Sequence, residues 1–140
     1  MEDCPFCDLG SQEKYIVYQT AHAYSLIPLA PLLEGHVMVL PKRHTTMEDL
    51  TSDELREIND MLFRLKEHLK RLYPSNPPLI ATTTDTRHSS RPGHFHYHLI
   101  PSEVNLRVLW STYYEEVPEN KRLDDSELGR MAKKLRPGGL

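Results

Sequence analysis

Hydrophobic and polar residues follow each other in different patterns along the chain, and the changes of pattern mark the expected elements. Residues 15–19 and 23–27 are short aromatic or β-branched runs around a polar turn, typical of a hairpin. Residues 36–40 form a continuous apolar run, short enough for a buried strand and ended by Pro41. Residues 79–84 and 93–101 indicate two more strands. The pattern therefore predicts about five strands before residue 102.

A long helix is expected to begin after Thr51. Thr51 and Glu54 have the spacing of a capping box, with a hydroxyl at the N-cap and a carboxylate three residues later. Apolar residues then recur at spacings of three and four, which predicts one buried stripe, and Pro74 ends the helix. The stripe consists of Leu55, Ile58, Leu62, Leu65, Leu69 and Leu72.

The C-terminal part of the chain is less regular. Residues 104–117 could hold another strand, and residues 124–135 predict a short helix with Asp124 as its N-cap. Its inward-facing residues would be Leu128, Met131, Ala132 and Leu135. A strand-rich chain with one long helix and a short C-terminal helix indicates an α+β fold with an antiparallel sheet. The 140 residues contain no repeat or linker, so we expect a single domain over residues 1–140.

Composition narrows the class of protein. Hydrophobic residues make up 39% of the chain and charged residues 26%, which indicates a globular protein. A net charge of -3 argues against a binder of nucleic-acid polymers. No apolar run reaches the roughly 20 residues that span a bilayer, so we expect no membrane partner. The acidic start of the chain lacks the pattern of a secretion signal, and the cytoplasm is the expected compartment.

Three of the eight histidines, His94, His96 and His98, alternate along one predicted strand. Alternate residues of a strand share a face and lie roughly 7 Å apart. The intervening residues, Phe95, Tyr97 and Leu99, would face the core. Burying three imidazoles costs desolvation free energy, and nothing in the packing of the strand compensates for it. We therefore interpret the three histidines as functional and not as an exposed strand face that carries histidines by chance.

Imidazoles in this arrangement could bind a metal or act as catalysts. The outer two lie about 13 Å apart along a strand, too far to chelate one ion, which favours catalysis. A neutral imidazole is a good nucleophile near pH 7, and its phosphorylated form is a good donor. A flanking imidazole can fix the tautomer of the nucleophile or protonate the leaving group.

Two segments of the chain resemble the histidine triad (HIT) family. The residues His94-Phe95-His96-Tyr97-His98-Leu99-Ile100 match its signature His-φ-His-φ-His-φ-φ, in which φ is apolar. Residues 35–44, Gly-His-Val-Met-Val-Leu-Pro-Lys-Arg-His, look like its Gly-His-x-φ-Val-φ-Pro-Lys-x-His segment. The resemblance covers nearly the whole chain to Pro101. It implies a HIT-like α+β fold and a homodimer.

The resemblance also implies chemistry on the α-phosphate of a nucleotide conjugate, such as a dinucleoside polyphosphate, a phosphoramidate or an adenylated compound. His96 would attack phosphorus and form a nucleotidyl-histidine, which water or another acceptor resolves. His98 and His36 would hydrogen-bond the phosphate and orient the imidazole, although His36 could also simply begin a strand. His94 would have a structural role, and no organic cofactor is implied.

Cys4 and Cys7 suggest a metal clip near the N-terminus. A redox pair would need a preceding strand, for which there is no room. Zinc needs about four ligands, so two more are required. Some bacterial and archaeal members of the HIT family combine such a cysteine pair with histidines at the positions of His44 and His94. The resemblance thus implies a structural zinc site of Cys4, Cys7, His44 and His94. The alternative is a pair of unligated surface thiols.

The chain departs from the family pattern around the substrate. Pro28 stands where relatives commonly carry an acidic or amide side chain for the ribose, and the loop over residues 83–90 lacks the usual glycines and glutamine. Hydroxyl and guanidinium groups of the loop region could still bind phosphate, although the arginines could equally be solvated. These candidate substrate contacts are Thr83, Arg87, Ser89, Ser90 and Arg91. The departures leave the substrate open.

Three functions fit the sequence. The leading one is a nucleotide phosphoryl hydrolase or nucleotidyl transferase. The second is a phosphorylase or uridylyltransferase-like enzyme, in which phosphate or a sugar phosphate replaces water. The third is a nucleotide-binding module that has lost catalysis. Of the remaining histidines, we expect His22 and His68 to be solvated and assign no role to His88.

Overall fold

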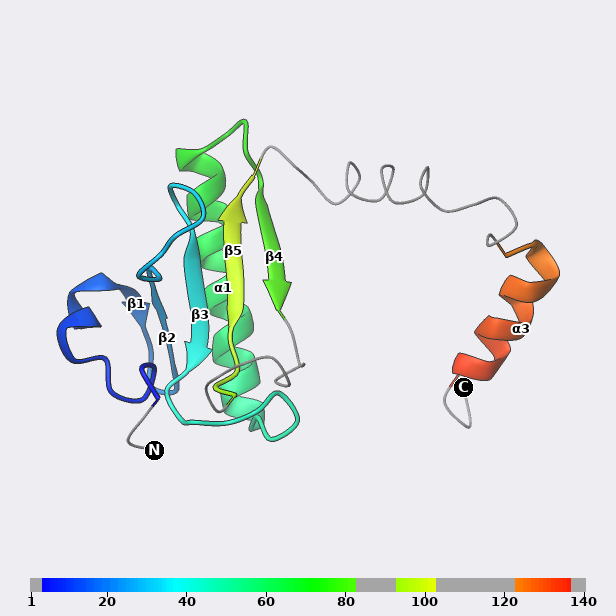
Figure 1. Cartoon of the computed structure of the whole chain (residues 1–140), viewed down its shortest axis with the longest axis horizontal. Helices are drawn as coiled ribbons and strands as arrows, with labels where there is room; N and C mark the ends of the chain where they lie inside the picture. Colours follow the sequence, from blue (N-terminus) through cyan, green and yellow to red (C-terminus); the bar gives the residue numbers. More distant parts are fainter. Residues whose placement is uncertain (1–3, 83–92, 103–122, 137–140) are drawn as a thin grey trace. The chain divides into compact units, whose positions relative to one another are not determined.

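The structure is a computed structural model that describes residues 4–82, 93–102 and 123–136. The chain forms two compact units, Met1–Asn105 and Leu106–Leu140. The first unit contains the sheet and the long helix (Figure 1), and all eight histidines of the sequence fall within its residue range. None of the described helices is long and apolar enough to cross a membrane.

Five antiparallel strands form the sheet, in the order β1-β2-β3-β5-β4 (Figure 1). The strands are β1 (Ile16–Gln19), β2 (Ala23–Leu26), β3 (Val37–Pro41), β4 (Pro78–Thr82) and β5 (Tyr97–Pro101). A short 3-10 helix, η1 (Gly10–Tyr15), precedes β1 and was not expected from the sequence. The α+β fold with an antiparallel sheet is confirmed.

The long helix α1 (Ser52–Leu72) begins with the expected capping box. The Thr51 hydroxyl accepts a hydrogen bond from the Glu54 amide, and the Glu54 carboxylate accepts one from the Thr51 amide. The predicted stripe is confirmed in its middle but is wrong at its two ends, where Leu55 and Leu72 are exposed. The apolar residues that α1 buries are Ile58, Met61, Leu62, Leu65 and Leu69. A regular spacing predicts which side of a helix can be buried, but not how far along the helix the buried contacts extend.

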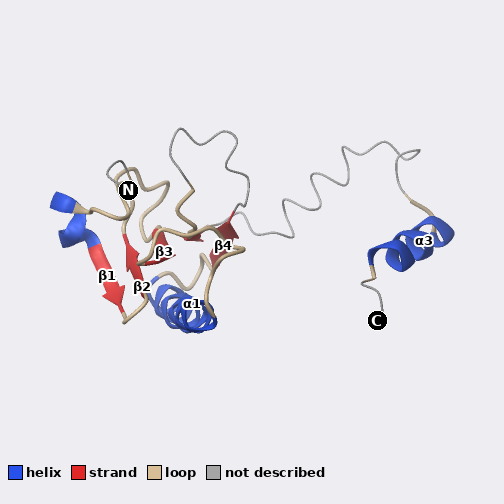
Figure 2. Cartoon of the chain, turned by 90° about the horizontal axis from the view of Figure 1, so that it is seen from below, coloured by secondary structure: helices blue, strands red, loops and turns tan. Residues whose placement is uncertain are grey.

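The two faces of the sheet have different coverings (Figure 2). Helix α1 packs on one face, where Val37, Val39 and Leu99 join its buried residues in a single cluster. On the other face Met38 and Leu40 pack with Tyr24 and with Phe6 of the N-terminal segment. Alternation along β3 therefore gives each strand residue a buried environment, which explains why its sequence is apolar throughout.

The histidine-bearing strand is shorter than the sequence indicates. The pattern predicts a strand over residues 93–101, whereas β5 begins only at Tyr97. The β3–β5 ladder stops at the pair Val39–Tyr97, and farther along β3 lies Pro41, which has no N–H to donate to a ladder. The expected side-chain alternation nevertheless persists, because Phe95 and Leu99 are buried and Tyr97 packs against the helix-side core.

Gly35 allows the chain to turn tightly into β3. Its φ is +86°, and a Cβ atom there would lie 2.7 Å from the Tyr73 ring and 2.8 Å from Pro101. Only glycine fits both this backbone conformation and this close approach. The turn places His36 directly before β3, on the face opposite α1.

The second unit contains helix α3 (Asp125–Leu135), whose expected N-cap, Asp124, forms a capping box with Glu127. The prediction of its inward-facing residues is wrong: α3 buries no residue, and Leu128, Met131 and Leu135 are exposed. An apolar stripe on a helix predicts which side can be buried, but it does not provide the partner that buries it. The possible strand over residues 104–117 lies outside the described residues, and the expectation of one domain over residues 1–140 stays a prediction.

Candidate active site and metal centre

The imidazoles of His36, His96 and His98 lie next to one another on the face of the sheet opposite α1. His36 enters from the turn before β3, and His98 lies beside it on β5, where Met38 and His98 are register partners. The ring centroids are 5.1 Å apart for His36 and His98 and 4.9 Å apart for His96 and His98. The His96 and His98 rings thus lean toward each other more closely than the roughly 7 Å that separates alternate positions on a strand.

A backbone amide sets the tautomers of His36 and His98. The Leu32 N–H donates to His36 Nδ1 at 3.0 Å, so the proton of neutral His36 lies on Nε2. His36 Nε2 lies 2.9 Å from His98 Nδ1, and it therefore donates to that atom. The proton of neutral His98 is left on its own Nε2. We call His36 and His98 the relay pair.

The tautomer of His96 follows from a carbonyl. His96 Nδ1 lies 2.9 Å from the His94 carbonyl oxygen, which can only accept a hydrogen bond. The proton of neutral His96 therefore lies on Nδ1, and Nε2 is left unprotonated, with its lone pair. The Thr82 hydroxyl donates to the His96 carbonyl at 2.6 Å and fixes the backbone at this residue.

Burial favours the uncharged form of both imidazoles of the relay pair. Burial, together with the charges of His96 and His36, lowers the pKa of His98 to about 4. Burial also lowers the pKa of His36. Both imidazoles are thus neutral at pH 7, which the hydrogen bond between them requires, since each must offer one bare nitrogen to its donor.

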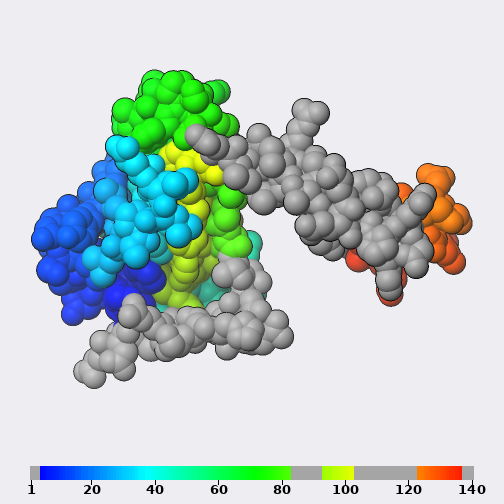
Figure 3. Space-filling view, turned by 45° about the horizontal axis from the view of Figure 1, so that its top comes forward, coloured from blue at the N-terminus to red at the C-terminus, as the bar shows by residue number. Residues whose placement is uncertain are grey.

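Four potential metal ligands lie together beside the triad, by which we mean His94, His96 and His98. They are Cys4, Cys7, His44 and His94. Their sulfur and Nδ1 atoms all lie within 4.8 Å of one another. Cys7 Sγ is 3.3 Å from His44 Nδ1 and 3.6 Å from His94 Nδ1, while Cys4 Sγ is 3.5 Å from His94 Nδ1. The N-terminal segment thus lies beside the segment that leads into β5, and the space-filling view shows its residues next to that strand (Figure 3). We call these four residues the metal clip.

The donor atoms of the metal clip fit a tetrahedral zinc ion. Bonds of about 2.3 Å to sulfur and about 2.0 Å to nitrogen separate tetrahedral ligand atoms by roughly 3.3–3.8 Å. Three of the four sulfur–nitrogen distances fall in this range, and no two of the four ligand atoms are more than 4.8 Å apart. His94 Nε2 donates to the Pro41 carbonyl at 2.7 Å, which leaves Nδ1 bare and directed at the two sulfur atoms. The four residues named from the sequence are thus brought together by the fold.

Phe6 is a site residue that the sequence pattern did not reveal. Its ring centroid lies 5.8 Å from those of both His94 and His96, and its carbonyl accepts a hydrogen bond from the Tyr24 hydroxyl. Phe6 therefore links the metal clip to the triad. The available signal was its position between Cys4 and Cys7, where an aromatic side chain must lie close to whatever the cysteines bind.

The candidate substrate residues of the loop, Thr83, Arg87, Ser89, Ser90 and Arg91, lie outside the described residues, as does His88. His68 is exposed, as expected. His22 is also exposed, but it is not simply solvated, because its backbone N–H and its imidazole both contact the Glu57 carboxylate.

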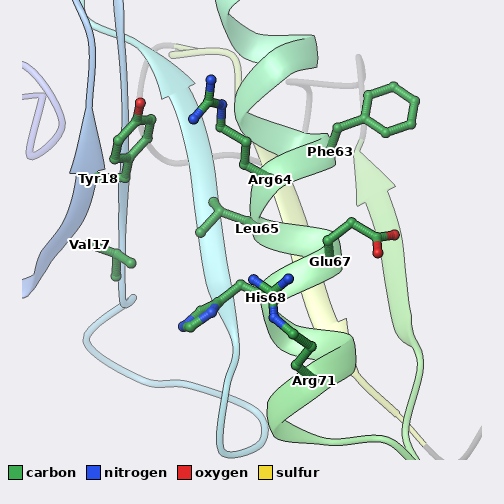
Figure 4. Close-up of a pocket in the computed structure, with 8 residues that line it drawn as sticks. All are labelled: Val17, Tyr18, Phe63, Arg64, Leu65, Glu67, His68 and Arg71. Carbon is green, nitrogen blue, oxygen red and sulfur yellow. The ribbon is translucent and has the colours of Figure 1, made fainter.

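A groove on the helix side of the sheet lies apart from this cluster (Figure 4). It runs between β1 and α1, and Arg64 and His68 extend from the helix toward the strand. Its lining residues are Val17, Tyr18, Phe63, Arg64, Leu65, Glu67, His68 and Arg71. None belongs to the relay pair, the metal clip or the triad, so the groove contributes nothing to the chemistry of those groups.

Comparisons with known proteins identify the family. A family model described as the HIT domain matches residues 10–105, which is more than half of the chain, and the protein belongs to the HIT family. An adenosine 5'-monophosphoramidase of Candida albicans is 27% identical over 144 residues, covering 95% of this chain and 89% of that protein. An asymmetrical bis(5'-nucleosyl)-tetraphosphatase of Schizosaccharomyces pombe is 27% identical over 114 residues, covering 81% of this chain and 61% of that protein.

Solved structures agree on the fold. A HIT family member from Bacillus subtilis superposes with a TM-score of 0.72 at 14% identity, covering 94% of each chain. This superposition confirms the HIT-like fold. An identity of 14% gives no information about the substrate.

Proposed function

We propose that this HIT protein is a nucleotide-conjugate hydrolase or nucleotidyl transferase that acts at the α-phosphate through His96. The observation that carries the proposal is the hydrogen bond from His96 Nδ1 to the His94 carbonyl, because it leaves Nε2 as a free nucleophile beside the relay pair. The relatives named as a monophosphoramidase and a tetraphosphatase support a nucleotide hydrolase.

In the first step the Nε2 lone pair of His96 forms a bond to the α-phosphorus. The bond from phosphorus to the leaving group breaks, and its electron pair departs with that group. His98 carries its proton on Nε2 and offers it to a phosphate oxygen. His36 has both ring nitrogens engaged, by Leu32 and by His98, so it orients His98 rather than touching the phosphate.

In the second step water attacks phosphorus and loses a proton to solvent. The phosphorus–nitrogen bond breaks, its electron pair returns to His96 Nε2, and the nucleotide leaves. Phosphate or a sugar phosphate in place of water would make the protein a phosphorylase or transferase. Adding phosphate and identifying the products distinguishes these acceptors, because phosphorolysis yields a nucleotide with one more phosphate.

The metal clip would hold a structural zinc ion. Zinc would supply no step of the reaction there, since four protein ligands leave no open coordination position. Cys4, Cys7, His44 and His94 would instead fasten the N-terminal segment to the segment that precedes β5. Both cysteines are free thiols in the structure, which suits the reducing cytoplasm, where we place the protein.

We also propose that the protein is a homodimer. Strand β4 lies at the edge of the sheet, and its residue Ile80 is 41% exposed. An edge strand with an exposed apolar residue is a surface that a second copy can cover. Sedimentation equilibrium tests this proposal, and a monomer at micromolar concentration would contradict it.

A screen of nucleotide conjugates tests the catalytic proposal. We expect turnover of at least one conjugate by the parent protein and a fall of about 10⁴-fold or more in His96→Gly. His68→Ala is the matched control, because His68 lies on the groove and not in the cluster, and its turnover should stay within about twofold of the parent. Undiminished turnover in His96→Gly would exclude it as the nucleophile. Tight nucleotide binding without turnover by the parent would favour the non-catalytic module.

A further inference from the structure

The segment of residues 41–45, which follows β3, holds the segment that carries His94 and His96 at three points. The Pro41 carbonyl accepts a hydrogen bond from His94 Nε2 at 2.7 Å. The His44 and His94 rings meet edge to face with centroids 5.1 Å apart. The carbonyl of buried Thr45 accepts a hydrogen bond from the Phe95 N–H at 2.9 Å. We call residues 41–45 the anchor segment, because its position sets the positions of a clip ligand and of the triad.

Arg43 fastens the anchor segment to α1. Its Nε and Nη2 donate to the two carboxylate oxygens of Glu54, each at 2.9 Å, and Nη2 also donates to the Asp49 carbonyl at 2.8 Å. Glu54 is only 3% exposed and belongs to the capping box of the helix. The fork of two parallel bonds fixes the direction of the guanidinium as well as its distance, which a lysine could not do.

We propose that Arg43 and Glu54 are positioning residues that set the anchor segment, and through it His44 and the His94–His96 segment, against the rigid start of α1. The effect on His44 rests on the metal clip proposed above, whereas the effect on the Phe95 hydrogen bond does not. Arg43 is the adjacent residue to His44, so a loss of the fork lets His44 Nδ1 drift from Cys7 Sγ. It also lets the Thr45 carbonyl drift from the Phe95 amide.

Arg43→Met tests the proposal, with Arg56→Met as the matched control. Arg56 also pairs with a carboxylate of α1, Asp53, at 2.8 Å, but that pair is exposed and has no contact with the anchor segment. Two quantities are measured: the affinity and visible spectrum of Co²⁺, which replaces Zn²⁺ as a probe, and hydrogen exchange of the Phe95 amide relative to amides of the β2–β3 ladder.

We expect Arg43→Met to weaken Co²⁺ binding by about 10–100-fold and to disturb its tetrahedral spectrum. Exchange at Phe95 should accelerate by about tenfold or more relative to the ladder, because its acceptor is no longer held. Arg43→Lys should lie between parent and Arg43→Met, and Arg56→Met should match the parent. If Arg43→Met does not fold, Glu54→Gln replaces it, since glutamine keeps the capping box but removes the charge from the fork.

Equal effects of Arg43→Met and Arg56→Met would overturn the proposal. Equal acceleration of Phe95 and of the ladder, with an unchanged Co²⁺ spectrum, would also overturn it, because the pair would then serve global stability alone. If the parent binds no Co²⁺, the metal clip fails as a proposal, and selective exchange at Phe95 alone decides the role of Arg43 and Glu54.

Discussion

At one end of the histidine cluster the imidazoles of His44 and His94 face two thiols, and at the other end those of His36 and His98 face each other. The side chains are the same, so their partners decide what each imidazole can do. The Pro41 carbonyl holds the proton of His94 on Nε2 and leaves Nδ1 for a metal. The Leu32 amide holds the proton of His36 on Nε2 and directs it at His98.

His96 lies between these two environments and takes its tautomer from a third backbone group, the His94 carbonyl. The tautomers of three histidines, His36, His94 and His96, are therefore set by main-chain atoms and not by other side chains. A main-chain carbonyl remains whatever side chain its residue carries, and a main-chain N–H remains in every residue except proline, so these tautomers do not depend directly on the side chains of the residues that set them. We therefore expect that the metal clip and the relay pair can be disabled separately.

The largest effect is expected from Cys4→Ser/Cys7→Ser. Bound metal should fall from one equivalent to none detectable, and the free energy of unfolding should fall by about 3–5 kcal/mol, since metal binding contributes directly to folding. Elemental analysis and denaturant titration measure the two quantities. Fully folded parent protein without metal would contradict the metal clip, whereas loss of metal with unchanged stability would limit its role to the N-terminal segment.

Disabling the relay pair should affect turnover more than stability. His36→Ala removes the donor to His98 Nδ1, and we expect kcat to fall by about 10²-fold with little change in KM. His36→Gln is the matched variant, because its amide offers both a donor and an acceptor and should recover part of the loss. Steady-state kinetics and metal content are measured together. Loss of metal in His36→Ala would show that the two ends are not separate.

Gly35→Ala tests how the relay pair is held. A Cβ at this position would approach Tyr73 and Pro101 too closely, at a φ of +86°, and we expect a loss of about 1–3 kcal/mol in unfolding free energy. Gly10→Ala is the control, because Gly10 also has a positive φ but open space around it, so its loss should stay near about 1 kcal/mol. Equal losses in thermal or urea unfolding would mean that backbone strain alone, and not the close approach, matters at Gly35.

Stability should also depend on pH. The pKa of His98 is lowered to about 4 in the folded protein, below the value near 6.5 of an unfolded histidine. Between these values the unfolded state binds more protons, so the contribution of His98 is full above about pH 6.5 and declines as the pH falls toward 4. His98→Asn should flatten this part of the curve of unfolding free energy against pH. A slope identical to that of the parent would contradict the buried, neutral His98.

Much of the fold could be predicted from the sequence because local signals dominate it. The capping box at Thr51, the apolar run of β3 and the alternation around Phe95 and Leu99 each depend on near neighbours. The errors arise where distant partners decide. Strand β5 begins late because Pro41 interrupts the ladder across from it, and α3 keeps its apolar side exposed because no described residue buries it.

In the candidate site, too, some features could be predicted from the sequence, and those that depend on distant partners could not. The metal clip was inferred from a resemblance, since no spacing rule relates Cys4 to His94, and the fold does bring the four residues together. The contact of Phe6 with His96 and the fork between Arg43 and Glu54 were not foreseen. The first joins segments far apart in sequence, and the second joins the segment after β3 to the start of α1. Both use side chains of ordinary type, so composition and periodicity do not predict them.

Trapping the covalent intermediate is the sharpest test of His96 as the nucleophile. A nucleotide conjugate that is turned over would be mixed with the parent protein, quenched in denaturant at alkaline pH, where phosphohistidine is stable, and digested for peptide mass spectrometry. We expect a nucleotidyl group on His96, absent from His96→Gly and accumulating to a lower level in His36→Ala. A nucleotidyl group on any other residue, or turnover with no adduct at His96 under conditions that trap one in a HIT relative, would contradict this mechanism.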